Sequence, residues 1–144
     1  DVLGSRGLGD VYKRQLAECR RVLKNGGRFL CSTYGKQHMR EITDLVQQFH
    51  KEIVLSAEVL YERFGLENGE NLLAPYFPEI QMRRYEDAIE IAEAEPLISY
   101  ILSCHGNQNQ LLLNQYKEFR EFVSARVADG FHITKDAGIF LCRK

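Results

Sequence analysis

The segment from Leu16 to Met39, LAECRRVLKNGGRFLCSTYGKQHM, constrains the fold more than any other part of the sequence. Its apolar residues with helical spacing are Leu16, Cys19, Val22 and Leu23. Lys24 favours a helix C-terminus, and Gly26 can adopt the positive φ that ends a helix. We therefore expect this helix to end at Asn25 or Gly26.

A short apolar run and a polar loop follow the helix. Residues 28–31 are expected to form a buried strand, and Ser32, Thr33, Tyr34 and Gly35 place hydroxyl groups and a flexible backbone directly after it. In open α/β sheets, ligands bind at the carboxyl ends of the strands. The order helix, strand and polar loop therefore predicts an α/β fold with a ligand site in this loop.

Residues 5–15, SRGLGDVYKRQ, resemble a translated sequencing-library adapter, so we expect residues 1–15 to be non-native. The glycines in this stretch also suggest a phosphate-binding loop. Such a loop needs a buried strand before it and a helix that begins at its last glycine, and the sequence indicates neither. We expect the natural sequence to start near Leu16, inside a helix, and the chain to be a C-terminal fragment whose parent has a further N-terminal half.

The composition is that of one globular domain or part of one, with 144 residues, 44% hydrophobic and 27% charged. Residues 1–15 hold three of the 19 basic and two of the 20 acidic residues, which leaves a net charge of −2 for the rest. This balance gives no electrostatic reason to expect binding to nucleic acid or to an anionic membrane. No apolar run approaches the roughly 20 residues that span a bilayer, so we expect a cytoplasmic protein.

The cysteines and histidines show no spacing typical of metal or redox sites. They are Cys19, Cys31, Cys104 and Cys142, and His38, His50, His105 and His132. Cys31 and Cys142 fall in apolar runs, where a free cysteine behaves as a small buried hydrophobic residue. We therefore expect neither a metal site nor a disulfide framework.

Apolar spacing and turn residues divide the rest of the chain into further elements. A helix is expected over residues 37–50, and a strand followed by a crossover helix implies parallel pairing through a right-handed connection. Residues 53–66 give no clear assignment. The remaining expected elements are helices over 70–77, 93–102 and 109–129, a strand over 80–91 that is bulged or turned near 86–87, and a hairpin or bulged strand over 131–142.

The run Arg21–Leu30, RVLKNGGRFL, resembles the late part of class I S-adenosylmethionine-dependent methyltransferases, where it forms a helix and the fifth strand. Asn25 stands where that family usually has proline. Further segments resemble a subgroup of small bacterial methyltransferases, and together they extend the resemblance over residues 16–144. These segments are Ser32–Gly35 with His38–Glu41, Phe64–Gly69, Tyr85–Asp87 and Ile133–Phe140.

The resemblance implies the C-terminal half of a Rossmann-like domain, with a mixed sheet and flanking helices. It also implies methyl transfer from S-adenosylmethionine to a small-molecule acceptor in the full-length parent. The family's glycine-rich loop and its ribose-binding acidic residue belong to the half before Leu16, so no residue of this chain is assigned to cofactor binding. We therefore expect this chain to be inactive alone.

The resemblance places Thr33, Tyr34 and His38 where the fifth strand meets the acceptor substrate. The ordinary pKa of histidine, roughly 6.5, suits a general base, which makes His38 the candidate catalytic residue. A histidine at the start of a helix also commonly serves as a capping or packing residue, and that alternative stays open.

Three further residues are candidates for binding the substrate. Glu67 and Asn68 place a carboxylate beside an amide, a pair that suits a polar ligand, although Asn-Gly is also a common turn former. Tyr85 belongs to the resembling segment Tyr85–Asp87, but alternation alone does not show which face of the strand it occupies.

Two other classes of function remain open. A non-catalytic ligand-binding protein of the same fold would lack the cofactor loop, which lies outside this chain. An oxidoreductase would need a dinucleotide-binding fingerprint upstream and a hydride-transfer site in this chain, and no Tyr-x-x-x-Lys pair follows the first strand. The sequence gives no information on oligomeric state.

Overall fold

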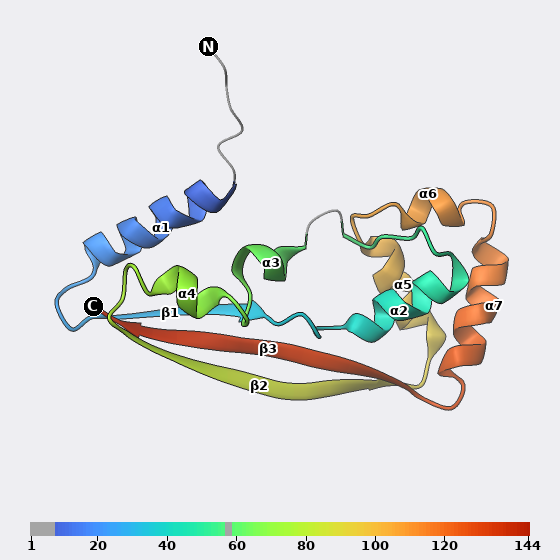
Figure 1. Ribbon diagram of the computed structural model, residues 1–144. Helices are drawn as coiled ribbons and strands as arrows, with labels where there is room; N and C mark the ends of the chain where they lie inside the picture. The colour runs from blue at the N-terminus through green and yellow to red at the C-terminus, as the bar shows by residue number, and fades with distance from the viewer. Residues whose placement is uncertain (1–7, 57–58) are drawn as a thin grey trace, which may run out of the picture. The chain divides into compact units, whose positions relative to one another are not determined.

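The computed structural model describes residues 8–56 and 59–144, which form two compact units. The sheet unit comprises residues 8–36, 60–85 and 136–144, and the helical unit comprises residues 37–56, 59 and 86–135. Figure 1 shows the elements of both units, which are mixed α and β, as the sequence predicts.

The sheet unit contains α1 (Leu8–Val22), β1 (Arg28–Tyr34), α3 (Leu60–Phe64), α4 (Gly69–Leu73) and the larger parts of β2 (Glu79–Ile91) and β3 (Phe131–Arg143). Helix α1 ends at Val22 rather than at Asn25 or Gly26. The chain then turns through Lys24, whose carbonyl accepts a hydrogen bond from the Gly27 amide at 2.8 Å, and Gly26 has φ 74°. Gly26 therefore has the positive φ that we expected. It lies in a tight turn after the end of α1, and the helical spacing of the apolar residues does not show this turn.

The three described strands form one antiparallel sheet in the order β1-β3-β2. Strand β1 pairs with β3 from Arg28 opposite Arg143 to Tyr34 opposite Ala137. The parallel pairing that we expected for β1 is therefore wrong within the described part of the chain. A crossover helix predicts parallel pairing only if the next strand returns beside the first, and here the last strand takes that place.

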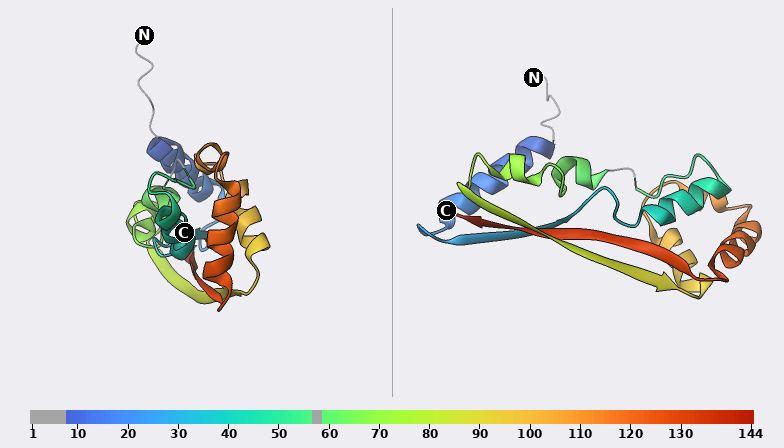
Figure 2. Two further views of the ribbon diagram at one scale, coloured as in Figure 1. Left: turned by 90° about the vertical axis from the view of Figure 1, so that its right-hand side faces the viewer. Right: turned by 60° about the horizontal axis from the view of Figure 1, so that its bottom comes forward.

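Helices α1, α3 and α4 lie along the same side of the sheet in both figures (Figures 1 and 2). Apolar side chains of α1, α4, β3 and the connecting loops form one core, which consists of Leu16, Leu66, Leu73, Phe77, Phe140 and Cys142, and Phe64 of α3 packs against it. The ring of Phe29 stacks on the ring of the core residue Phe77, with centroids 5.3 Å apart. On β1 the alternate residues Leu30 and Tyr34 are exposed, so the opposite face of the sheet is open to solvent.

The helical unit contains α2 (Arg40–Phe49), α5 (Ala94–Ser103), α6 (Gln108–Leu112) and α7 (Tyr116–Val127). Its core is larger and consists of Ile42, Leu45, Val46, Ile53, Leu97, Ile98, Ile101, Leu112, Phe119, Val123, Val127 and Ile133. The rings of Phe49 and Phe119 meet edge to face at 5.2 Å. Each helix therefore has one apolar side turned toward the same centre, as expected for amphipathic helices.

Several expected boundaries shift in the structure. The helix expected from residue 37 begins at Arg40, because Met39 adopts a left-handed conformation with φ 55°. The helix expected over 109–129 is two helices, α6 and α7, with a turn in which the Gln115 amide donates to the Leu112 carbonyl at 3.0 Å. Strands β2 and β3 are continuous, so the turns expected at 86–87 and 135–138 do not form.

Glu41 connects α2 to β3 within the helical unit. Its carboxylate accepts hydrogen bonds from the Thr134 amide at 3.1 Å and from the Thr134 hydroxyl. Burial raises the pKa of the Glu41 carboxyl, but the hydrogen bonds from Thr134 and from the Glu41 backbone, together with the charge of His132, outweigh burial and hold the pKa below its ordinary value of 4.5. The ionised form is therefore the one that the fold stabilises.

Replacing Glu41 with glutamine should lower the free energy of unfolding by about 1 kcal/mol at pH 7. Because the folded pKa is the lower one, ionised Glu41 stabilises the fold above the unfolded pKa, and this contribution is lost as the pH falls through the folded pKa. The difference between wild type and Glu41→Gln in urea denaturation should thus shrink below about pH 4.5. Glu121→Gln, an exposed change on α7, is the matched control, and a difference independent of pH would contradict this account.

Candidate functional site

A pocket of about 480 Å³ lies in the sheet unit at the carboxyl end of β1. Its lining residues are Ser32, Thr33, Tyr34, Leu60, Phe64, Tyr85, Ala137, Gly138 and Ile139. Three of the residues that the sequence analysis assigned to substrate binding, Thr33, Tyr34 and Tyr85, belong to this lining. They come from two strands that are about 50 residues apart in sequence, and the fold brings them to one cavity.

The register between β1 and β3 builds two walls of the pocket. Ser32 lies opposite Ile139, Thr33 opposite Gly138 and Tyr34 opposite Ala137, and all six residues line the cavity. A β-carbon on Gly138 would lie 2.7 Å from the Arg83 carbonyl oxygen and 2.9 Å from Leu66 Cδ2, so glycine at this position permits close packing beside the pocket. The cavity therefore depends on the pairing of a specific part of each strand.

Helix α3 supplies another wall through Leu60 and Phe64. The Thr33 hydroxyl donates a hydrogen bond to the Phe64 carbonyl at 2.5 Å, and the Phe64 ring packs edge to face on Phe140 with centroids 5.8 Å apart. Thr33 therefore has a structural task, because it ties the end of α3 to β1. The hydrogen of the Thr33 hydroxyl is therefore already donated to the protein backbone when a ligand enters this site.

The chemistry of the lining is aromatic, aliphatic and hydroxylic. Tyr34 is 46% exposed and Tyr85 is 63% exposed, so both rings are accessible to a ligand. None of the described lining residues carries a carboxylate, an imidazole, an ammonium or a guanidinium group. Such a lining suits recognition by ring packing and hydrogen bonding rather than by ion pairing.

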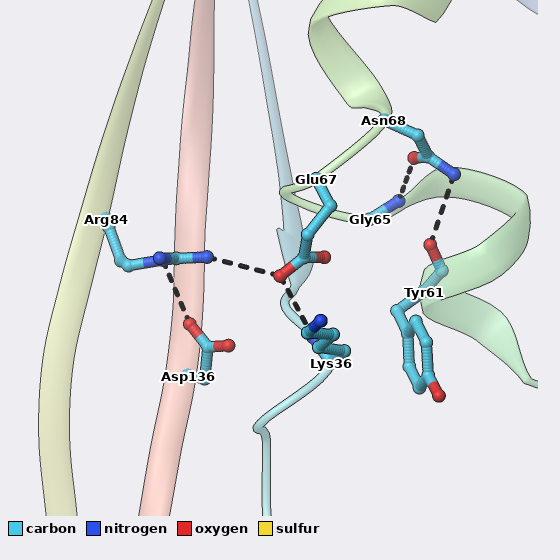
Figure 3. Close-up of polar contacts among 7 residues, drawn as sticks. All are labelled: Lys36, Tyr61, Gly65, Glu67, Asn68, Arg84 and Asp136. Atoms are coloured by element: carbon cyan, nitrogen blue, oxygen red, sulfur yellow. Dashed lines mark hydrogen bonds and ion pairs between the residues drawn. The ribbon is translucent and has the colours of Figure 1, made fainter.

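Glu67 does not line the pocket but belongs to a charged cluster in the sheet unit (Figure 3). Its Oε1 accepts hydrogen bonds from the Lys36 amide at 3.2 Å and from Arg84 Nη2 at 3.3 Å. Arg84 Nε also contacts Asp136 Oδ1 at 3.0 Å. Arg84 is thus shared by two carboxylates, and Asp136 is only 7% exposed. The sequence analysis assigned Glu67 to substrate binding, but the structure places its carboxylate in this internal cluster.

Gly35 makes room for the charged cluster. A β-carbon built on Gly35 would lie 2.1 Å from the Asp136 carboxylate, and the Gly35 amide donates to the Asp136 carbonyl at 2.9 Å. A side chain at position 35 would therefore displace the carboxylate that holds Arg84. The glycine that the sequence analysis assigned to a flexible loop serves close packing instead.

Asn68 likewise lies outside the pocket lining and organises the turn between α3 and α4 (Figure 3). Its Oδ1 accepts a hydrogen bond from the Gly65 amide at 2.7 Å, and its Nδ2 donates to the carbonyls of Tyr61 at 3.3 Å and Glu62 at 2.7 Å. These contacts fit the turn-forming alternative that the sequence analysis left open.

His38 belongs to the helical unit, where it is half-buried in the turn that precedes α2. It is not among the residues that line the pocket. Its assignment as a general base therefore stays a prediction.

Sequence reasoning missed residues 137–139, which pairing with β1 brings to the pocket, and also Leu60 and Phe64, which reach it from helix α3. It also missed the ion pair between Arg84 and Asp136. One signal for Asp136 was present: it lies in phase with Gly138, Phe140 and Cys142, on the buried side of β3. An acidic residue at such a position predicts a charged partner inside the fold.

Burial, together with the neighbouring Cys142 and Cys19 thiols, raises the pKa of the Cys31 thiol to about 11. Cys31 is therefore a neutral thiol near pH 7 rather than a thiolate nucleophile. All four cysteines are free.

The described part of the chain offers neither a metal site nor a membrane-spanning helix. No set of three or more His, Cys, Asp and Glu side chains within residues 8–56 and 59–144 is placed to hold a metal ion. In the same ranges, no helix combines the length and apolar character needed to cross a membrane. The chain matches no protein-family model and no curated protein sequence.

Proposed function

We propose that this chain is part of an S-adenosylmethionine-dependent methyltransferase and that the pocket at the end of β1 holds its small-molecule acceptor. The observation that carries the proposal is the convergence of Thr33, Tyr34 and Tyr85 on one cavity. The methyltransferase resemblance had assigned these residues to the acceptor side from two separate segments.

The pocket suits the acceptor better than the cofactor. No carboxylate lines it within the described residues, so it offers no group of the kind that binds the ribose hydroxyls of a nucleoside. We therefore place the S-adenosylmethionine site outside these residues, in the N-terminal half that the resemblance implies. The task of the pocket in this proposal is to orient the acceptor and to keep water away from it.

The position of β1 in the sheet supports the placement of the acceptor in this pocket and of the cofactor in the N-terminal half. Among the described strands, β1 has β3 on one side and stands at the edge of the sheet on the other. An edge strand presents unpaired backbone donors and acceptors that another strand can bind. In our proposal a strand of the cofactor-binding half pairs with this edge, which brings the cofactor to the carboxyl end of β1.

The test is calorimetry on two proteins, the present chain and a longer one that adds the sequence upstream of Leu16 in the genomic reading frame. We expect the longer protein to bind S-adenosylmethionine and S-adenosylhomocysteine and the present chain to bind neither, because the cofactor site lies upstream. Absence of binding of both ligands to the longer protein would overturn the proposed function.

A variant of the longer protein separates the acceptor site from the cofactor site. Tyr85→Ala should leave S-adenosylmethionine affinity unchanged, since Tyr85 lines only the acceptor pocket in this proposal. A loss of cofactor affinity in that variant would place the cofactor, rather than the acceptor, in this pocket.

A further inference from the structure

The charged cluster of Glu67, Arg84 and Asp136 lies outside the lining of the pocket. Arg84 forms ion pairs with Asp136 at 3.0 Å and with Glu67 at 3.3 Å, as Figure 3 shows for the three side chains. Tyr85 follows Arg84 on β2 and Ala137 follows Asp136 on β3, and both Tyr85 and Ala137 belong to the lining of the pocket.

The groups that remain at the pocket are rings and hydroxyls. Tyr34 and Tyr85 are both exposed at the cavity, and Phe64 adds a third ring from α3. Aromatic side chains prefer to pack on other rings, in offset or edge-to-face arrangements. The Ser32 hydroxyl can donate or accept a hydrogen bond.

An ionised ligand would lose hydration in this pocket without meeting an opposite charge among the described lining residues. Burying an unpaired charge is costly, whereas a neutral hydroxyl can exchange its water for a protein hydroxyl at little cost. A flat ring would in addition bury apolar surface against Leu60, Phe64 and Ile139.

From this lining we infer that the pocket binds an uncharged, planar aromatic ligand that carries a hydroxyl group, a ligand of the phenol class. The inference rests on the proposed function in one respect, that this ligand would be the methyl acceptor. The binding itself depends only on the pocket, which lies wholly within the sheet unit.

The test is a titration of the ¹⁵N-labelled chain, without S-adenosylmethionine, with three probes of similar size: phenol, benzoate and benzylammonium. At pH 7 phenol is neutral, because a phenolic pKa is roughly 10, while the other two probes carry one negative and one positive charge. We expect phenol to shift the amide signals of residues 32–34 and 137–139 and to bind at least about tenfold more tightly than either ion, a difference of about 1.4 kcal/mol. Equal or tighter binding of a charged probe, or shifts confined to other residues, would overturn the inference.

Two variants at one position separate the ring from the hydroxyl. Tyr85→Ala should weaken phenol binding severalfold, whereas Tyr85→Phe keeps the ring and should lose less. Tyr116→Ala is the matched control, because Tyr116 is 42% exposed, lies on α7 in the helical unit and does not line the pocket. Equal weakening by Tyr116→Ala would show that phenol binds nonspecifically, and unchanged binding in Tyr85→Ala would also count against the pocket.

Failure of the inference and failure of the proposed function give different results. Phenol binding to this chain together with no S-adenosylmethionine binding to the longer protein would keep the pocket and reject the methyltransferase. S-adenosylmethionine binding to the longer protein without phenol binding to this chain would keep the methyltransferase and reject the phenol-class ligand.

Discussion

Replacing Phe140 with alanine should lower the free energy of unfolding by about 3–5 kcal/mol, as measured by urea denaturation followed by circular dichroism. The Phe140 side chain is fully buried in the core of the sheet unit, where its ring packs edge to face on Phe64. Its removal leaves a cavity next to the wall of the proposed acceptor pocket. Phe140→Leu should cost less, because leucine refills part of the space.

Gly69 provides a sharper test of this packing. A β-carbon on Gly69 would lie 2.5 Å from Cε2 of Phe140, so Gly69→Ala alone should destabilise the protein by about 1–3 kcal/mol through overpacking. In the Phe140→Ala background the same β-carbon would enter vacated space. The double variant should therefore be more stable than the sum of the two single changes predicts, and strict additivity would show that the two residues are not in contact.

The second large effect concerns the ion pair of the sheet unit. Arg84→Met should lower the free energy of unfolding by about 2–3 kcal/mol, because it leaves the Asp136 carboxylate buried without its guanidinium partner. Loss of a fully buried partner costs more, but Arg84 is 39% exposed, so solvent screens part of the interaction. Arg28→Met, at the exposed start of β1, is the matched control and should have little effect.

A second substitution tests whether the buried charge is the cause. Arg84→Met combined with Asp136→Asn should be more stable than Arg84→Met alone, since an amide carries no charge that needs compensation. If the double variant were the less stable of the two, groups other than Arg84 would stabilise the carboxylate, and the loss of the guanidinium charge would not be the cause of the destabilisation. The amide signal of Tyr85, the next residue on β2, would report whether the pocket changes as well.

Local signals in the sequence predicted those elements that local interactions determine. The apolar run over residues 28–31 lies in β1, which continues through 32–34, where we expected a loop; the alternation over residues 80–91 is β2, and the early proline with the apolar residues after it marks α5. Helical spacing over residues 109–129 did not reveal the turn at 113–115, because α6 and α7 both contribute apolar residues to the same core. A periodic pattern shows that a face is buried, but it does not show that the helix is unbroken.

Non-local pairing explains the remaining differences. The Lys-Asp-Ala-Gly sequence at 135–138 has the composition of a turn, yet pairing with β1 and β2 keeps β3 extended there. The same pairing makes β1 antiparallel to its neighbour. Tertiary hydrogen bonding overrides local propensity at these positions.

The candidate site, like the fold, was predicted in part from the sequence. Thr33, Tyr34 and Tyr85 were identified from the segments that resemble methyltransferases, and they line one pocket. Glu67 and Asn68 come from a resembling segment too, but their side chains satisfy internal partners. A motif can reflect the geometry of a turn as well as the chemistry of a ligand, and only the contacts separate the two.

The hydrogen bonds of Asn68 also bear on how this protein ages chemically. Asparagine followed by glycine is prone to deamidation, which begins when the glycine amide nitrogen attacks the side-chain carbonyl of asparagine. In this turn that carbonyl accepts a hydrogen bond from Gly65, and the Gly69 amide is itself bonded to the Gly65 carbonyl at 2.8 Å. In the turn between α3 and α4, the Gly69 amide and the Asn68 side-chain carbonyl are thus both engaged in other hydrogen bonds. Deamidation of Asn68 therefore requires this turn to open first.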